Sequence, residues 1–452
     1  MVVATENRII SGVIWKQILI FFFPILLGTF FQQLYNTFDA VIVGQFVGTA
    51  ALAAVGGATG NLVNIVVNLF VGIASGATVI IAQSVGASEL DKVRKTVHTA
   101  VALSLCGGLA FTVFGALIAR PALAAMGTPD DVIDFAVTYL TVYFFGAIPS
   151  FFYNVGAGIL RAVGDTKRPL YFLMVACVTN IVLDVVLKMG VFGAALATVV
   201  SQWVSAVLIF IVLTHTTRIY HMEPSMIRFS SDALKAVLKI GIPVALQSNM
   251  FAMSNVIVQS CINSFGTDTM AAWTSFAKVD GFFWMISSAY GISITTFAGQ
   301  NFGAGRYDRI RKSVRVCLGM FSVTAICMSV LMVSCAGVFL RMFTQDADVL
   351  AIGTQLIYHM MPFYITYVCI EILSGAICGC GQSLIPMIMT GCGICLMRII
   401  WIFAVVPLHR DILTVAASYP ISWTLTSLCF VVYYMRGKFL PKESKTSCPN
   451  NS

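Results

Sequence analysis

Apolar residues dominate this chain in twelve long runs, which shorter polar segments separate. Each run is long enough to cross a bilayer as a helix, which takes about 20 residues. The runs cover residues 13–43, 50–83, 96–119, 132–160, 169–188, 191–214, 236–264, 269–300, 314–340, 349–378, 384–407 and 411–435. Two of them, 50–83 and 269–300, are long enough to need tilt or protruding ends. The pattern predicts an all-α integral membrane protein with twelve transmembrane helices.

The polar segment 215–235 is longer than the other links and divides the runs into two sets of six. The predicted organisation is therefore an N-terminal six-helix lobe over residues 1–214, a cytoplasmic linker over 215–235, a C-terminal six-helix lobe over 236–437 and a cytoplasmic tail over 438–452.

The composition is also that of a membrane protein. The chain is 58% hydrophobic and 10% charged, with a mean hydropathy of +0.90, unlike a soluble domain. Most of the 13 cysteines lie inside apolar runs, so no disulfide framework is indicated. Cys392 and Cys395 have the spacing of a redox or metal pair, but they lie in an apolar run, and we interpret them as packing residues. The first run is too long for a cleavable signal peptide.

The 27 lysines and arginines set the predicted orientation. If the N-terminus is cytoplasmic, 21 of them fall on the cytoplasmic side, and only Arg120, Lys188, Arg341 and Arg410 fall outside. Basic residues concentrate in the cytoplasmic loops of membrane proteins, so both termini are predicted to be cytoplasmic, in a cell membrane. The net charge of +8 is then explained by topology rather than by a nucleic-acid partner.

Proline and glycine recur at matched positions in the two halves of the chain. The matched elements are Pro24 with Pro243, Gln83-x-x-Gly86-Ala87 with Gln300-x-x-Gly303-Ala304, Pro149 with Pro362, and Gly164-Asp165-Thr166 plus Pro169 with Gly381-Gln382-Ser383 plus Pro386. The offset in residue number is nearly constant across the four pairs. Six helices per unit give both halves the same orientation, related by a pseudo-two-fold axis along the membrane normal. This is the parallel-repeat plan of a transporter, with the substrate path between the halves. The alternative is coincidence of proline and glycine.

The paired Gln-x-x-Gly-Ala elements, the Gly-Asp-Thr-x-x-Pro turn and the six-plus-six plan resemble the multidrug and toxic compound extrusion (MATE) family over residues 13–435. The resemblance implies a V-shaped pair of six-helix lobes. It also implies export of organic cations against an inward flow of protons or sodium ions.

Two acids lie inside predicted helices of the first lobe, Asp39 and Asp184. Each precedes the outer end of its helix by about two turns, so the two share a depth. Asn180 shares the helix face of Asp184, and Thr198 reaches a comparable depth on the next helix. No intramembrane lysine or arginine neutralises the acids, so one should hold a proton or both should hold a hard cation such as sodium. The alternative is that both acids lie at the outer interface and hydrogen-bond or cap neighbours.

The resemblance assigns these residues a role. In the DinF-like branch of the MATE family, an acid in helix 1, an Asn and an Asp four residues apart in helix 5, and a Thr in helix 6 form the cation site. It therefore implies that Asp39, Asn180, Asp184 and Thr198 bind the coupling cation, with Na+ at Asp39 and Asp184 as the only metal expected.

The second lobe carries Lys278, Asp280, Glu371 and Arg398 in predicted helices, and their charges sum to zero. They could neutralise one another as buried pairs. The functional alternative is that Asp280 or Glu371 faces the path and attracts a cationic substrate. Another branch of the family uses acids in helices 7 and 10, but helix 7 here has none, which argues against a second ion site. The predicted substrate path comprises Gln33, Asn36, Asn154, Gln247, Asp280 and Glu371.

The leading hypothesis is a monomeric secondary antiporter that exports amphipathic organic cations in exchange for H+ or Na+, without a cofactor. The sequence leaves the ion open. The alternative is a lipid-linked saccharide flippase of the same superfamily, but only Lys278 and Arg398 are candidates to hold its pyrophosphate. A membrane enzyme or an ATP-driven pump is disfavoured, because we find no P-loop, nucleophile elbow or metal-ligand spacing in the sequence.

Pro24 lies about four helical turns before Asp39. It removes a backbone hydrogen bond and is predicted to be a hinge, at which ion binding bends or straightens the first helix. The alternative is a tolerated proline near the inner end of that helix.

Overall fold

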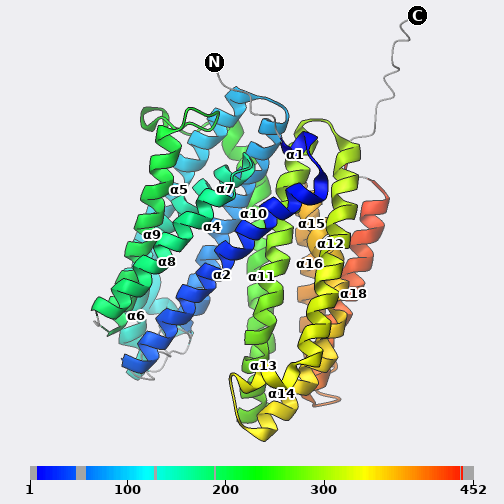
Figure 1. The fold of residues 1–452 in the computed structure, drawn as a ribbon. Helices are drawn as coiled ribbons and strands as arrows, with labels where there is room; N and C mark the ends of the chain where they lie inside the picture. The colour runs from blue at the N-terminus through cyan, green and yellow to red at the C-terminus, as the bar shows by residue number, and fades with distance from the viewer. Residues whose placement is uncertain (1–7, 47–57, 127–129, 188–189, 438, 441–452) are drawn as a thin grey trace, which may run out of the picture.

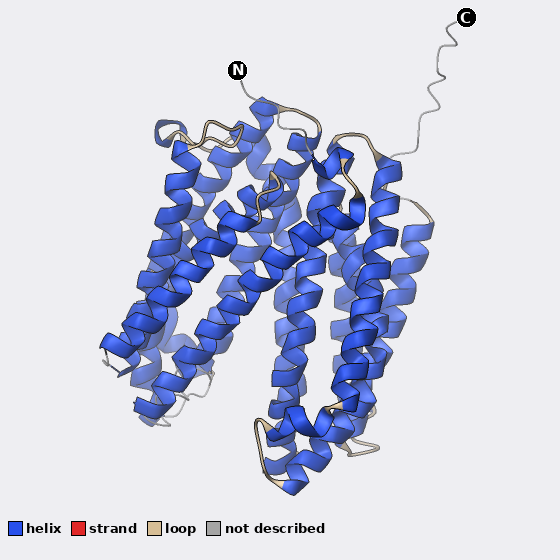
Figure 2. Cartoon of the chain, viewed as in Figure 1, coloured by secondary structure: helices blue, strands red, loops and turns tan. Residues whose placement is uncertain are grey.

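The computed structural model describes residues 8–46, 58–126, 130–187, 190–437 and 439–440, and within them every regular element is a helix (Figure 2). The first half contains α1 (Arg8–Ser11), α2 (Ile14–Phe46), α4 (Ala58–Gly86), α5 (Leu90–Ala125), α6 (Asp130–Phe145), α7 (Ala147–Ala162), α8 (Lys167–Leu187) and α9 (Gly190–His215). The second half contains η1 (Pro224–Met226), α10 (Ser231–Asn263), α11 (Thr267–Gly303), α12 (Tyr307–Ser334), α13 (Ala336–Arg341), α14 (Ala347–Met360), η2 (Met361–Phe363), α15 (Tyr364–Gly379), α16 (Leu384–Thr390), η3 (Gly391–Leu396), α17 (Met397–Ala404) and α18 (Ile412–Met435).

The described helices correspond to the twelve predicted runs. Ten segments are long and apolar enough to cross a membrane by themselves, and α6 with α7, bent by 48° relative to each other, makes an eleventh. The remaining run is α11, a single helix of 37 residues. The predicted fold class, an all-α membrane protein in two six-helix lobes, is confirmed.

The fourth run of each lobe is interrupted close to its matched proline. In the first lobe, the chain bends between α6 and α7, three residues before Pro149. In the second lobe, α14 ends in the 3-10 turn η2, which contains Pro362, before α15 begins. Proline has no N–H group and its ring clashes with the preceding helical turn, so both interruptions have the same cause.

The matched Gln-x-x-Gly-Ala elements end α4 and α11 in the same way. After α4, Ser88 has φ of 59° and the N–H of Glu89 donates to Ser84 O at 2.9 Å. After α11, Gly305 has φ of 69° and the N–H of Arg306 donates to Asn301 O at 2.9 Å. A left-handed residue followed by this bond back across the last helical turn is a Schellman end. The repeat seen in the sequence is thus a repeat of helix ends.

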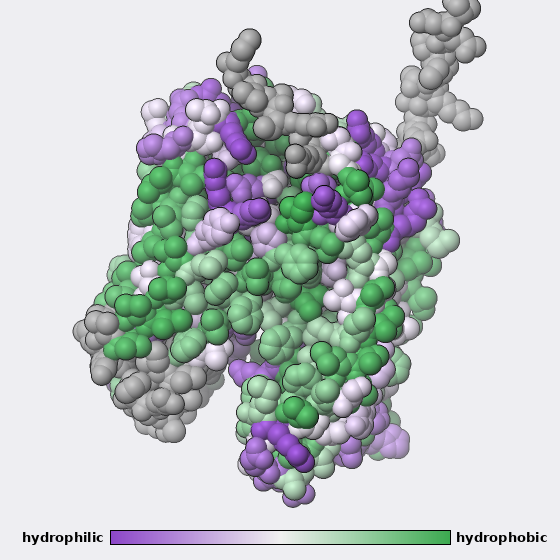
Figure 3. Space-filling model, in the orientation of Figure 1, coloured by the Kyte–Doolittle hydropathy of each residue, from purple (hydrophilic) through white to green (hydrophobic). Residues whose placement is uncertain are grey.

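The two lobes meet at one end of the molecule and diverge at the other (Figure 1). We call the end with α1 and the last turn of α18 the terminal face, and the opposite end the open end. Near the terminal face, a Cβ on Gly86 would lie 1.9 Å from Gln300 O, so the backbones of α4 and α11 are in direct contact. Farther along, Asn68 Nδ2 donates to Asn249 Oδ1 at 3.4 Å. Figure 3 shows the hollow that separates the lobes at the open end.

Helix α2 crosses from one lobe to the other (Figure 1). Near its start, the rings of Phe21 and Phe22 pack on Phe297 and Tyr290 of α11, with centroids 5.6 and 4.3 Å apart. Farther along, it packs on α8 of the first lobe, where a Cβ on Gly28 would lie 3.3 Å from Leu173 Cδ1. Pro24 lies between these two contacts, within an unbroken helix. A change of direction at this proline would therefore alter how the lobes sit relative to each other.

The lateral surface is apolar, as a bilayer requires. Large hydrophobic side chains such as Leu117 and Phe403 are each 71% exposed. Figure 3 shows hydrophobic residues along the sides of both lobes and hydrophilic residues gathered at the terminal face. A continuous apolar surface of this extent indicates contact with lipid rather than water.

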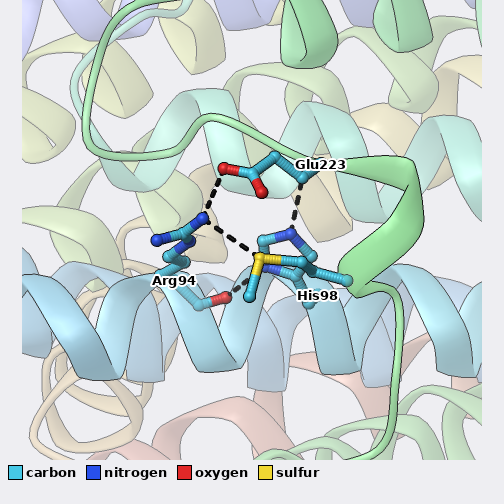
Figure 4. Close-up of polar contacts among 4 residues, drawn as sticks. Arg94, His98 and Glu223 are labelled. Atoms are coloured by element: carbon cyan, nitrogen blue, oxygen red, sulfur yellow. Dashed lines mark hydrogen bonds and ion pairs between the residues drawn. The ribbon is translucent and has the colours of Figure 1, made fainter.

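The segment 216–230 between α9 and α10 is docked on α5 by a polar cluster (Figure 4). The backbone N–H of Glu223 donates to His98 Nε2 at 3.1 Å, while His98 Nδ1 contacts Arg94 O at 2.8 Å. The Nδ1 atom therefore carries the hydrogen, and Nε2 is the acceptor. The guanidinium of Arg94 donates to the Glu223 carboxylate. His98 is 4% exposed, so it holds the segment rather than serving as a ligand.

We predict that His98→Leu releases this segment. The substitution leaves the buried N–H of Glu223 without its acceptor, at a cost of about 1–3 kcal/mol. Trypsin should then cleave the purified protein after Arg218 or Arg228 about tenfold faster, because cleavage follows the population of the opened segment. His215→Leu is the matched control, since the described polar contacts of His215 stay within the end of its own helix. Equal cleavage of His98→Leu and the unmutated protein would show that the cluster does not hold the segment.

Candidate functional site

The candidate ion site lies where α2, α8 and α9 pack against one another, in the part of the first lobe nearest the open end (Figure 1). Asn180 and Asp184 lie one turn apart on α8 and are 0% and 4% exposed. Thr198 on α9 is 3% exposed, and its hydroxyl donates to Ala194 O at 3.1 Å. The structure therefore buries the three predicted residues whose side chains it describes. Asp39 is in α2, but its side chain lies outside the described ones.

Burying these polar side chains has an energetic cost. An ionised carboxylate in an apolar surrounding is costly unless it is protonated, hydrogen-bonded or close to a cation. The side-chain oxygen and nitrogen of Asn180 are buried and make no hydrogen bond to any described residue. A carboxylate, a carboxamide oxygen and a hydroxyl on adjoining helices are oxygen donors of the kind that hard cations prefer.

One residue near this site was not predicted from the sequence. Gln202 lies four residues after Thr198 on α9, and its Oε1 atom is buried without a hydrogen bond to any described residue. It lies at the bend between α6 and α7, because a Cβ on Gly146 would be 2.3 Å from Gln202 Oε1. The signal that could have found it is the four-residue spacing from Thr198, which places both side chains on one helix face.

The other predicted path residues of the first lobe are not brought into one cluster. Gln33 is exposed on α2, and the side chain of Asn36 lies outside those described. Asn154 on α7 donates to Ser150 O of its own helix at 2.8 Å. In the second lobe, Gln247 is half-buried on α10.

Neutral hydrogen-bond donors contact the acids of the second lobe, so close buried ion pairs, one of the two interpretations of the sequence, are not formed among the described residues. Arg398 and Asp280 attract each other only over a longer distance. Asp280 accepts hydrogen bonds from Tyr364 Oη and from Trp284 Nε1, the latter at 2.8 Å. Glu371 accepts one from Tyr367 Oη at 3.2 Å. Among the described residues, no ion pair joins either acid to Lys278 or Arg398. Lys278 is exposed. Aromatic hydroxyl and indole groups, which the charge count ignored, satisfy these carboxylates.

A symmetrical pair of hydrogen bonds closes the terminal face. Gln83 Nε2 of α4 donates to Gly379 O at the end of α15, at 2.8 Å. Gln300 Nε2 of α11 donates to Ala162 O at the end of α7, at 2.6 Å. The two donors are counterparts in the repeat, and the two acceptors are separated by the same offset as the donors. Each lobe therefore binds the backbone of the other with the glutamine of the repeated motif, so the two lobes are held together at this face.

Comparisons with known proteins support this architecture. The MatE family model matches residues 24–186 and 243–403, one segment in each half. The probable multidrug resistance protein YoeA of Bacillus subtilis (strain 168) is 25% identical over 93% of this chain and 93% of its own length. The probable multidrug resistance protein YpnP of the same organism is 28% identical over 78% of this chain and 80% of its own length. A structure described as the outward-facing conformation of a multidrug resistance MATE family transporter of the MOP superfamily superposes with a TM-score of 0.88, at 22% identity, over 96% of this chain and 98% of its own.

Proposed function

Because the chain belongs to the MatE family, we propose that it is a secondary active multidrug efflux transporter that exports amphipathic organic cations in exchange for H+ or Na+. The observation that carries the proposal is the burial of Asp184 and Asn180 where α8 meets α2 and α9. A carboxylate inside a membrane-spanning lobe is a functional group by default, because its presence there is costly. The names of the relatives, probable multidrug resistance proteins, support drug efflux.

The terminal face is assigned to the cytoplasm and the open end to the outside. The distribution of lysine and arginine supports this orientation, since the sequence predicts 21 of 27 on the side of the N-terminus. The hollow between the lobes is then open to the outside, and the glutamine pair Gln83 and Gln300 closes the cytoplasmic side. This is the state that would release a drug and admit an ion.

In the proposed cycle, Asp39, Asn180, Asp184 and Thr198 bind the coupling cation from outside. Two neighbouring carboxylates hold either a shared proton or a hard cation, so these donors fit both H+ and Na+. The drug's positive charge would meet Asp280 or Glu371, which are half-buried on the second lobe. Binding of the ion and binding of the drug then act on different lobes and communicate through α2, which contacts both.

The test is uptake of a fluorescent cationic dye by everted membrane vesicles, with proton and sodium gradients imposed in turn. Dye should accumulate inside the vesicles when one of the gradients is present. Accumulation driven by ATP with both gradients abolished would contradict the proposal.

We predict that ion and drug oppose each other through α2. Ion binding near Asp39 changes the charge and packing of the second half of this helix, and Pro24 allows its direction to change. By reciprocal linkage, dye affinity should fall as the coupling-ion concentration rises, by a factor of about 5–150. Titration of dye binding to purified protein at several sodium and proton concentrations measures this. Asp39→Asn should remove the dependence, and dye affinity that ignores both ions in the unmutated protein would show that α2 does not couple them.

A further inference from the structure

A buried guanidinium in the second lobe has no part in the proposed ion exchange. Arg398 on α17 is 2% exposed, and its guanidinium carbon lies 3.8 Å from the centroid of the Tyr419 ring. Its Nε and Nη1 atoms make long contacts, each 3.4 Å, with Ser422 Oγ and Asn255 Oδ1. Both acceptors are neutral, and among the described residues Asp280 attracts the guanidinium only from beyond ion-pair distance. A buried cation without a directly paired anion is stabilised much less than one that faces an anion.

Two N–H groups at this place lack an acceptor among the described residues. They are Nη2 of Arg398 and Nε1 of Trp423. The guanidinium carbon is 5.9 Å from the centroid of the Trp423 ring, so the two groups are neighbours. Arginine and tryptophan side chains only donate hydrogen bonds, so rotation or a change of tautomer cannot satisfy either of them. A negatively charged acceptor would satisfy both.

The position of Arg398 in the repeat corresponds to that of the candidate ion site. Asn255 on α10 lies as far after Pro243 as Asn36 lies after Pro24, its matched proline. Arg398 follows Pro386 by one residue more than Asn180 follows Pro169. The π-helical turn η3 lies between Pro386 and Arg398, and its wider turn takes up the additional residue. Arg398 is therefore the counterpart of Asn180.

The two lobes thus have equivalent sites of opposite charge. In the first lobe, the site on α2, α8 and α9 carries carboxylates, and in the second lobe, the site on α10, α17 and α18 carries a guanidinium. We propose that the second-lobe site, which we call the Arg398 site, binds a carboxylate of the transported molecule. A zwitterion is then held at this site through its carboxylate, whereas a plain cation does not use the site. This proposal rests on the proposed efflux function.

The surroundings of the Arg398 site suit such a molecule. Arginine binds carboxylates through paired N–H groups, and Nη2 is available for this together with Trp423 Nε1. The Trp423 ring also packs edge-on against Tyr364, with centroids 5.4 Å apart, and Tyr364 Oη donates to Asp280. An aromatic wall therefore lies between a cationic group and an acidic group, which matches a molecule with an aromatic body and two opposite charges. Asn255 is exposed, so the guanidinium is one side chain from the surface of α10.

The test uses two dyes that differ only in the carboxylate. Rhodamine B is a zwitterion with a free carboxylate, and its ethyl ester is a plain cation. Binding of each dye is measured by fluorescence polarisation on the purified full-length protein, for the unmutated chain and for Arg398→Gln, Arg398→Lys and Arg410→Gln. Arg410 is the matched control, because it is exposed and contacts Ser264 and Phe265 outside the Arg398 site.

Arg398→Gln should weaken binding of rhodamine B by about tenfold or more and leave binding of the ester unchanged, since a hydrogen bond to a charged group is lost. Arg398→Lys should retain part of the preference for rhodamine B, and Arg410→Gln should retain all of it. Equal weakening of both dyes would show a structural role and overturn the proposal, as would unchanged binding of rhodamine B. If both dyes bind as expected but vesicles accumulate neither, the efflux function fails and the Arg398 site stands.

Discussion

Asp184→Asn is expected to abolish dye transport driven by an ion gradient, with the protein still folded in the membrane. Asparagine keeps the size of the side chain and removes its charge. The loss of a charged ligand from a buried cation site is worth on the order of 3 kcal/mol, which corresponds to at least about a hundredfold in ion affinity. Because Asp184 is only 4% exposed, water can replace little of the interaction that the lost charge made with the cation. Initial rates of dye accumulation in everted vesicles, normalised to the amount of protein, measure the effect.

Asp134→Asn is the matched control for this experiment. Asp134 lies in the same lobe, but it is exposed and pairs with Arg120, and exposed ion pairs contribute little. Its removal should leave transport unchanged. Asp39→Asn should behave like Asp184→Asn. Normal transport by either of these two variants would remove that residue from the proposed coupling site.

Gly303→Ala is expected to open the terminal face. A Cβ at this position would lie 1.8 Å from the backbone oxygen of Gln83, an atom that cannot move away unless α4 and α11 separate. Overpacking of this kind costs about 1–3 kcal/mol, enough to shift the equilibrium toward the separated state by about 5- to 150-fold. Transport should fall, because the closed state of this face becomes rare.

The reactivity of the native residue Cys378 measures this opening, so no cysteine has to be introduced. It lies next to Gly379, which accepts the hydrogen bond from Gln83, and it is 7% exposed within the core of the first lobe. Its reaction with maleimide, followed by peptide mass spectrometry, should become about tenfold faster in Gly303→Ala. Cys317, 0% exposed in the core of the second lobe, should stay unreactive. Gly319→Ala is the control substitution, since a Cβ there meets no described atom within 4 Å. A slow reaction of Cys378 in Gly303→Ala would show that the face does not open there.

The sequence was sufficient to predict the helices, because a span of about 20 apolar residues has few other uses. It also predicted the repeat, because proline and glycine at matched positions recur for conformational reasons. Ser88 and Gly305 show this directly, since each has a positive φ in the same type of helix end. The sequence did not reveal that Gln83 and Gln300 bind the opposite lobe, because a repeated motif does not indicate which surface it meets.

The path of α2 and the partners of the second-lobe acids could not be predicted for a different reason. The apolar residues of α2 are spread around the whole helix, so no pattern indicated that it packs on α11 near its start and on α8 farther along. Asp280 and Glu371 were expected to pair with Lys278 and Arg398 because the charges balance. Hydrogen bonds from Tyr364 and Tyr367 satisfy them instead. Charge counting cannot detect neutral donors that only tertiary packing brings close.

Ion-driven exchange is the central claim, and dye movement in proteoliposomes that contain only this protein tests it most directly. Liposomes are loaded with a cationic dye, and an inward gradient of either sodium or protons is imposed without any nucleotide. We predict that one of the two gradients drives dye out against its own concentration gradient, and that this movement is absent in Asp184→Asn. The account would be contradicted if dye left the liposomes at the same rate with either gradient and with neither. Equal rates in Asp184→Asn and the unmutated protein would contradict it as well.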